Sequence, residues 1–310
     1  MNTFPTSIGN IQLRNPLILA SGFLGSTYSS LNRAYNAGLG AVTTKSIGLK
    51  SREGYPNPSV IYLPNTLSMV NAVGLANPGC KKFASELLHL ERDVDYVISI
   101  YGGSPEEFAD VILCFQKKIE NHPPLAFEMN LSCPHAKKLG SAVGSDPETV
   151  MDVVKAAKRV SDFPVWVKLT PNITSIVEIG ESAISAGADA LVAINTLVAM
   201  MIDITVKKPV LGNKKGGLSG RAIKPVGVRA IYDLYEHFGP KVPLVGVGGI
   251  WQWEDIIEYL LAGASAVQLG TIFTHTPSPE DLLPQLFTGI NNYLRNEGLS
   301  LPEIRGLAHE

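Results

Sequence analysis

Short apolar runs alternate with longer amphipathic segments over most of the chain. Runs rich in apolar residues predict eight strands, at residues 17–20, 42–45, 96–100, 125–130, 165–169, 190–194, 244–247 and 266–269. Between them, apolar residues at helical spacing predict helices at residues 29–37, 105–120, 147–161, 175–186, 224–238 and 253–262. Repeated strand–helix units form parallel sheets, and eight such strands predict an α/β fold of the TIM (β/α)8 barrel type.

An open, doubly wound sheet would give the same alternation of strands and helices. Its dinucleotide-binding form carries G-x-G-x-x-G after the first strand, and Gly22 and Gly25 do not have that spacing. We therefore expect the barrel, with non-helical insertions over the carboxyl ends of its strands at residues 48–77 and 200–220. No shift of composition divides the chain, so residues 1–310 are predicted to form one domain.

Charge and composition exclude several classes of function. The 26 basic and 28 acidic residues give a net charge of −2, which provides no positive field for a nucleic-acid backbone. The early apolar run at residues 16–20 is too short for a signal sequence or a membrane span. We expect an untargeted cytoplasmic protein that binds a small ligand.

The cysteines provide one candidate for chemistry. Cys80, Cys114 and Cys133 are too few for a disulfide framework, and none is spaced for a zinc or iron–sulfur site. This usage is typical of a reducing cytoplasm. We expect Cys80 and Cys114 to be inert buried thiols. Cys133 follows a predicted strand end, where nearby cations could activate a thiol as a nucleophile or base, although it too could be a buried bystander.

Polar residues and glycines leave strand after strand of the predicted barrel. The active sites of such barrels lie at the carboxyl ends of the strands, where backbone N–H groups after the last two strands often hold phosphate. Gly248 and Gly249, followed by Gly270 and Thr271, occupy those two positions. Lys45 and Lys168 end two other strands and each should face an anion, because an unpaired buried ammonium is costly.

With these features in place, the chain resembles class 1 of the dihydroorotate dehydrogenases. The resemblance covers nearly the whole chain and rests on motifs in the same order: TKS at 44–46, NAVGLAN at 71–77, NLSCPH at 130–135, KLTPN at 168–172, INT at 194–196, GGLSG at 216–220 and GG at 248–249. It implies a barrel that uses flavin mononucleotide (FMN) to oxidise dihydroorotate to orotate in pyrimidine synthesis.

The resemblance also implies a role for individual residues. Cys133 would be the base that removes the C5 proton while hydride leaves C6 for the flavin. FMN would be held by Ser21, Lys45, Ser46, Ser99, Asn130, Lys168, Ile194, Gly220, Gly248, Gly249, Gly270 and Thr271. The pyrimidine would be held by Lys45, Asn71, Ala72, Val73, Gly74, Leu75, Asn130, Asn195 and Thr196. No metal site is implied.

Within class 1, the chain looks most like the 1B type. Class 2 members use a serine base and carry an amino-terminal membrane extension, whereas this chain has Cys133 and begins almost at the barrel. The 1B type implies a homodimeric core, and a heterotetramer in which a partner subunit carries FAD and a 2Fe–2S cluster and passes electrons to NAD. The absence of a cysteine cluster here agrees with that division.

Two positions depart from the family pattern. His135 and Ser99 stand where asparagine is usual. His135 is shared with dihydropyrimidine dehydrogenases, so reduction of uracil or thymine is the alternative activity. A non-catalytic phosphate-binding barrel is an alternative of another class, and it would leave Cys133 without a use.

Overall fold

The computed structural model describes residues 4–132, 143–275 and 278–310. Its centre is a closed barrel of eight parallel strands in the order β10-β15-β16-β3-β4-β7-β8-β9. The strands are β3 (Leu17–Leu19), β4 (Ala41–Thr43), β7 (Tyr96–Ile100), β8 (Ala126–Asn130), β9 (Val165–Leu169), β10 (Ala190–Ala193), β15 (Leu244–Val247) and β16 (Ala266–Leu269). The (β/α)8 barrel expected from the sequence is confirmed.

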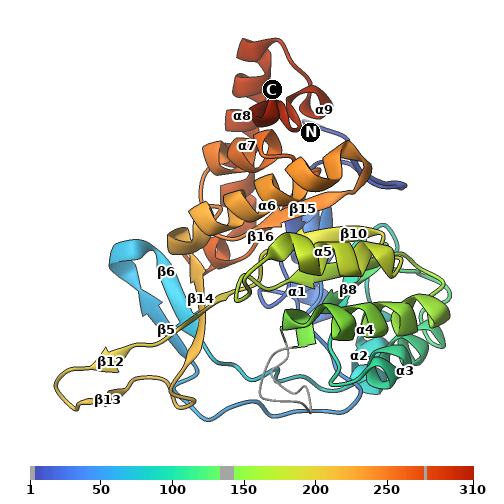
Figure 1. Cartoon of the computed structure of the whole chain (residues 1–310), viewed down its shortest axis with the longest axis vertical. Helices are drawn as coiled ribbons and strands as arrows, with labels where there is room; N and C mark the ends of the chain where they lie inside the picture. The colour runs from blue at the N-terminus through green and yellow to red at the C-terminus, as the bar shows by residue number, and fades with distance from the viewer. Residues whose placement is uncertain (1–3, 133–142, 276–277) are drawn as a thin grey trace.

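Helices surround the barrel, and consecutive helices from α2 to α8 pack against one another (Figure 1). They are α1 (Tyr28–Asn36), α2 (Cys80–Leu87), α3 (Pro105–Gln116), α4 (Pro147–Val160), α5 (Ile176–Ser185), α6 (Lys224–Phe238), α7 (Trp253–Leu261), α8 (Pro279–Glu297) and α9 (Leu301–Ile304). Serine and aspartate caps fix several helix starts: the side chains of Ser104, Asp146 and Ser175 each accept a hydrogen bond from a backbone N–H in the first turn.

The prediction omitted helices α2 and α8 and the four-residue helix α9. Helix α2 spans only eight residues, Cys80–Leu87, and follows the long insertion, so its apolar period is brief. Helix α8 contains Pro284, a residue that normally argues against a helix interior. Both helices bury one face, through Phe83 and Leu87 in α2 and through Leu283 and Ile290 in α8. Tertiary packing therefore stabilises these helices, although the local sequence pattern does not predict them.

The core of the barrel has two parts. Between the strands and helices, large side chains such as Phe108, Phe115 and Tyr259 form one continuous apolar cluster. A second cluster fills the barrel interior around Val97 and Trp166. It reaches the short antiparallel strands β1 (Thr6–Ile8) and β2 (Ile11–Leu13), whose apolar residues cover that end of the barrel.

The two insertions join each other. Strands β5 (Val60–Leu63) and β6 (Ser68–Asn71) of the first insertion join β14 (Gly216–Gly220) of the second. Strand β11 (Leu197–Ala199), directly before the second insertion, completes the sheet, in the order β11-β14-β6-β5. A hairpin of β12 (Ile202–Asp203) and β13 (Lys208–Pro209) extends beyond this sheet and projects from the barrel (Figure 1). The predicted non-helical insertions thus form one antiparallel sheet beside the barrel.

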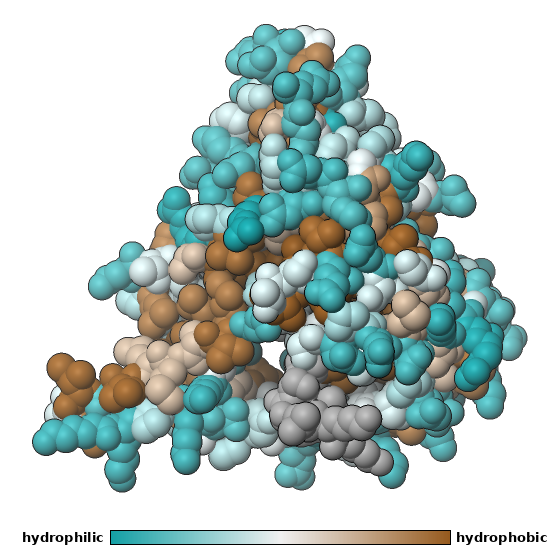
Figure 2. Space-filling model, in the orientation of Figure 1, coloured by the Kyte–Doolittle hydropathy of each residue, from teal (hydrophilic) through white to brown (hydrophobic). Residues whose placement is uncertain are grey.

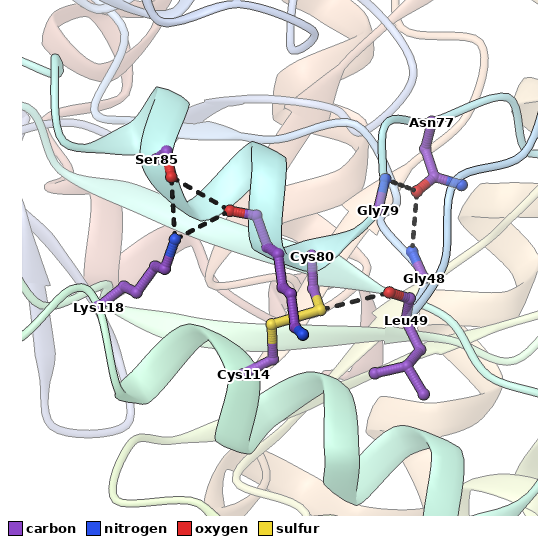
Figure 3. Close-up of a disulfide and its surroundings, with 9 residues drawn as sticks. Gly48, Leu49, Asn77, Gly79, Cys80, Ser85, Cys114 and Lys118 are labelled. Atoms are coloured by element: carbon purple, nitrogen blue, oxygen red, sulfur yellow. Dashed lines mark hydrogen bonds between the residues drawn. A yellow bond between two sulfur atoms is a disulfide. The ribbon is translucent and has the colours of Figure 1, made fainter.

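A disulfide between Cys80 and Cys114 corrects the expectation that both are inert thiols (Figure 3). The two residues lie 34 positions apart, and their Cα atoms are 6.3 Å apart because α2 packs along α3. The pairing depends on helix α2, which the sequence pattern did not reveal. The expectation of a reducing compartment therefore loses the support of two free thiols.

None of the helices in the described part of the chain is long and apolar enough to cross a bilayer. The longest, α8, spans Pro279–Glu297 and carries acidic residues in its first turn, Glu280 and Asp281. Its buried side chains pack with α7 rather than form a uniformly apolar surface.

Candidate active site

A cleft lies at the carboxyl ends of the barrel strands, where the sequence predicted the ligand site. It encloses about 500 Å³, part of which is open solvent. Strands on both sides of the barrel contribute to it, together with β14 of the added sheet. Its lining residues are Ala20, Ser21, Phe23, Lys168, Ile194, Asn195, Thr196, Ser219, Gly220, Ile223, Val247, Gly248, Gly249, Ile250, Gln268, Gly270 and Thr271.

A chain of hydroxyl and amide groups runs from one barrel strand to the next beside the cleft. The Ser46 hydroxyl lies 3.2 Å from that of Ser21 and 2.9 Å from that of Ser99. The Asn130 amide donates to the Ser46 oxygen at 3.1 Å, and the Asn195 amide donates to the Asn130 oxygen at 3.1 Å. Five predicted site residues from five strand ends therefore form one network.

Glycines shape the opposite wall of the cleft. Gly248 and Gly249 follow β15 with φ of +123° and +72°, and a Cβ on Gly249 would lie 2.6 Å from the Lys224 backbone nitrogen. Gly220, at the end of β14, has φ +93°. These positions keep the backbone bare, which allows a phosphate to approach N–H groups closely. Gly270 and Thr271 complete this wall from β16.

The Ser219 hydroxyl is an additional polar group in the cleft wall. Its oxygen is buried and has no hydrogen-bond partner among the described residues. Buried hydroxyls without a partner are uncommon because each costs about 1–3 kcal/mol. A polar ligand that accepted or donated a hydrogen bond here would remove this cost. The bare glycine wall and this hydroxyl together fit a phosphorylated, polar cofactor such as FMN.

Lys45 is a partly buried cation that lies two residues beyond the end of β4. Burial lowers the pKa of its ammonium group, and no other group is a cause of the shift. The ion pairs of the described residues do not include Lys45. An ammonium in this setting favours an anionic ligand, because a carboxylate would replace the lost hydration.

Lys168, by contrast, already faces an anion within the barrel. Its Nζ lies 2.7 Å from the Gln268 side-chain oxygen and 3.5 Å from a carboxylate oxygen of Glu128. Lys168 was predicted to face an anion. Within the protein that anion is the carboxylate of Glu128, a residue that was not among the predicted site residues. Lys168 is also one of the residues that line the cleft.

The candidate pyrimidine-binding residues fall into two groups. Asn195 and Thr196 line the cleft, and Asn172 fixes the Thr196 carbonyl with a 2.9 Å hydrogen bond. Asn71, on β6, reaches the same region by donating to the Gly217 carbonyl at 3.3 Å. A Cβ on Gly217 would lie 2.1 Å from the Thr196 hydroxyl, so this glycine lets the added sheet approach the barrel.

Other predicted residues lie outside the cleft lining. Ala72, Val73, Gly74 and Leu75 continue from β6 into the loop that Tyr55 covers, where a Cβ on Gly74 would meet the Tyr55 ring. Cys133 and His135 lie outside the described residues. Lys45, Ser46, Ser99 and Asn130 are not lining residues either, but three of these belong to the hydroxyl and amide network.

Glu128, Gln268 and Ser219 are polar residues that the sequence reading missed. Glu128 and Gln268 are fully buried, and they sit in β8 and β16. A signal was present, because each interrupts an apolar run that was otherwise interpreted as core. Ser219 falls inside the GGLSG segment, of which only Gly220 was predicted to bind the cofactor.

Comparison with known proteins identifies the family of the chain. The family model described as dihydroorotate dehydrogenase matches residues 3–292. The catalytic subunit of dihydroorotate dehydrogenase B (NAD(+)) from Methanocaldococcus jannaschii is 46% identical, with 98% of each chain covered. The proteins of that name from Pyrococcus abyssi and Pyrococcus furiosus are 47% and 48% identical, with 96% and 97% of each chain covered. The chain belongs to the dihydroorotate dehydrogenase family.

Proposed function

We propose that the chain is the catalytic subunit of an NAD-linked dihydroorotate dehydrogenase. It would oxidise (S)-dihydroorotate to orotate in pyrimidine (UMP) biosynthesis, in the cytoplasm. The observation that carries the proposal is the presence, at one barrel end, of a bare glycine wall and of a half-buried cation, Lys45, that forms no ion pair with a carboxylate of the described residues. Dihydroorotate carries the carboxylate that such a cation needs, whereas uracil and thymine do not.

The residues around the cleft fit FMN as the cofactor. The backbone at Gly248, Gly249 and Gly270 would hold its phosphate, and the Ser219 hydroxyl would gain a polar partner. When bound, FMN supplies the hydride acceptor of the reaction. Lys168 would place its positive charge beside the flavin ring.

The protein's own side chains would bind the substrate and move one proton. Lys45 would pair with the substrate carboxylate, and Asn71, Asn130 and Asn195 would hold the ring through amide hydrogen bonds. Cys133, as a thiolate, would take the proton from C5 while the C6–H bond breaks and its electron pair leaves as hydride. The two carbons thereby gain the double bond of orotate.

The proposal includes partners. The 310 residues would form one FMN-binding domain that assembles as a homodimer. A separate subunit with FAD and a 2Fe–2S cluster would carry electrons on to NAD. The name of the relatives, a catalytic subunit, supports the existence of such a partner. The described residues contain no cluster of histidine, cysteine and acidic side chains that could bind a metal ion.

Anaerobic reduction of the bound flavin tests the substrate. Purified protein should be yellow and release FMN on denaturation, and dihydroorotate should bleach it faster than dihydrouracil does. Faster bleaching by dihydrouracil would instead support the dihydropyrimidine dehydrogenase-like alternative. A colourless protein that takes up no FMN would contradict the proposal.

The variant Cys133→Ala tests the base. FMN should stay bound while the rate of flavin reduction by dihydroorotate falls by roughly 10²–10⁴, the usual contribution of a general base. Loss of FMN from this variant would indicate a structural thiol. The chain alone should reduce NAD poorly, and efficient turnover without a partner would contradict the NAD-linked assembly.

A further inference from the structure

Three buried polar side chains form a group below the cleft: Glu128 on β8, Lys168 on β9 and Gln268 on β16. They are 0%, 5% and 1% exposed. Buried charged and amide groups are costly in a barrel interior unless they are fully paired. Such a group at this depth therefore calls for an explanation beyond packing.

The hydrogen bonds within this group have a fixed direction. The Lys168 ammonium can only donate, and it donates to the Gln268 side-chain oxygen at 2.7 Å. The Gln268 side-chain nitrogen then donates to one carboxylate oxygen of Glu128 at 2.5 Å, while the other carboxylate oxygen lies 3.5 Å from the ammonium. Because the glutamine oxygen faces the cation and its nitrogen faces the anion, the carboxylate orients the amide, and the amide orients Lys168.

Strand register places the three side chains at different depths. Asn130, at the end of β8, pairs in register with Lys168, and Glu128 lies two residues earlier on the same face of that strand. Lys168 and Gln268 line the cleft, whereas Glu128 does not. Glu128 can therefore influence a ligand in the cleft mainly through the lysine.

We propose that Glu128 and Gln268 are positioning residues that hold the Lys168 ammonium in place at the cleft where FMN would bind. The inference rests on the proposed function, because it assumes that FMN occupies the cleft. Two N–H groups of the ammonium face Gln268 and Glu128, so a third can face the cofactor. A positive charge held at this point favours the electron-rich reduced flavin over the oxidised one.

Removal of the carboxylate should release this charge. In Glu128→Gln, the buried ammonium loses the carboxylate that it faces, and the Gln268 amide loses its charged acceptor, so the ammonium is no longer held in place. This change takes positive charge away from the flavin. The midpoint potential of bound FMN should fall by at least half of the shift that Lys168→Met produces, while the affinity for FMN changes by less than about tenfold.

The decisive experiment is a double-mutant cycle on the FMN-loaded chain, with the midpoint potential as the measurement. Glu128→Gln should lower the potential when Lys168 is present and add no further lowering to Lys168→Met. Gln268→Met, which removes the 2.7 Å acceptor, should act in the same direction and keeps the test available if Glu128→Gln does not fold. An unchanged or raised potential in these variants, or an equal fall in the Lys168→Met background, would overturn the inference.

Asp255→Asn is the matched control. Asp255 is also a buried carboxylate and pairs with Lys224 at 2.8 Å, but it lies at the start of α7. Its loss should lower thermal stability in the FMN-free protein, as Glu128→Gln should, without moving the potential. A wild-type chain that binds no FMN would contradict the proposed function itself, whereas bound FMN with unmoved potentials would overturn only the role of Glu128 and Gln268.

Discussion

At the scale of single residues, Lys168 and Lys45 have different surroundings. Lys168 has a carboxylate and an amide as partners inside the barrel. Lys45 is partly buried, its pKa is lowered by desolvation, and the ion pairs of the described residues leave it out. The first lysine is thus fixed by the protein, and the second is suited to pair with an incoming anion.

Replacement of Lys45 by methionine should weaken orotate binding by roughly 10–100-fold, because a charged hydrogen bond to the ligand contributes about 1.5–3 kcal/mol. The folded-state pKa of Lys45 lies below its ordinary value because of burial, so its charge is lost at a lower pH than that of an ordinary lysine. Orotate affinity of the wild type should therefore fall at alkaline pH.

Calorimetric titration with orotate at several pH values measures both effects. Lys45→Met should lack the alkaline transition that the wild type shows, and Lys45→Arg should keep tight binding to higher pH. If Lys45→Met bound orotate as tightly as the wild type, the substrate carboxylate would have another partner.

At the scale of elements, the disulfide ties the first insertion to the helical layer. Cys80 begins α2 directly after the loop that carries Asn77, whose side-chain oxygen accepts hydrogen bonds from Gly48 and Gly79 (Figure 3). Cys114 lies in α3. The bond therefore holds the end of the insertion against a helix that is packed on the barrel.

Reduction of this disulfide should lower the free energy of unfolding by roughly 2–4 kcal/mol, as expected for a bond that closes a loop of this order. Chemical denaturation with and without a thiol reductant measures the difference. The variant with both Cys80→Ala and Cys114→Ala should not respond to the reductant, whereas Cys133→Ala should respond as the wild type does. Three reactive thiols in the denatured, unreduced protein would show that the bond does not form.

Regular elements were accessible from the sequence, but contacts between distant elements were not. Strands 96–100, 165–169, 244–247 and 266–269 were predicted with the bounds that the structure gives, since each is a buried apolar run. At β4 the prediction extended to Lys45, whereas the strand ends at Thr43 and the Lys45 N–H turns to Gly25. The ends of a strand depend on which backbone groups pair by hydrogen bonds, and a pattern of residue types does not give that pairing.

The candidate site also contains some residues that the sequence predicts and others that depend on contacts between distant elements. Strand-end residues such as Ser46, Asn130 and Asn195 were predicted because barrel topology alone brings strand ends together. Glu128 and Gln268 were missed because one polar residue within an apolar strand does not change the apolar pattern from which the strand is predicted. The contact between Asn71 and Gly217 was missed because it needs the sheet that joins the two insertions.

At the scale of the whole molecule, an apolar arm projects from the barrel. We define the arm as residues 197–209, which include β11, β12 and β13. Figure 2 shows hydrophobic side chains gathered over the β12–β13 hairpin. Its exposed apolar residues are Val198, Met200, Met201, Ile202, Ile204 and Val206. Grouped exposure of this kind marks an interaction surface, whereas scattered apolar residues do not.

The exposed apolar side chains of the arm would be buried if the arm packed against a second copy of the chain, as in the proposed homodimer. Ile204 is 87% exposed and Val206 is 61% exposed, so each gains most by burial against another apolar surface. The hairpin also has unpaired backbone edges, which an identical hairpin could meet around a two-fold axis. This arrangement agrees with the proposed homodimer and leaves the cleft to its ligands.

Charged substitutions on the arm should therefore separate the dimer. If the wild type is the proposed homodimer, the combination of Ile204→Asp and Val206→Asp should convert it to a monomer in light scattering coupled to gel filtration, with bound FMN retained. Leu88→Asp is the matched control, because Leu88 is 59% exposed but lies beyond α2, away from the arm. A dimer that persists in the arm variant, or a wild type that is monomeric at micromolar concentration, would contradict this role, since burial of these side chains is what the arm contributes to association.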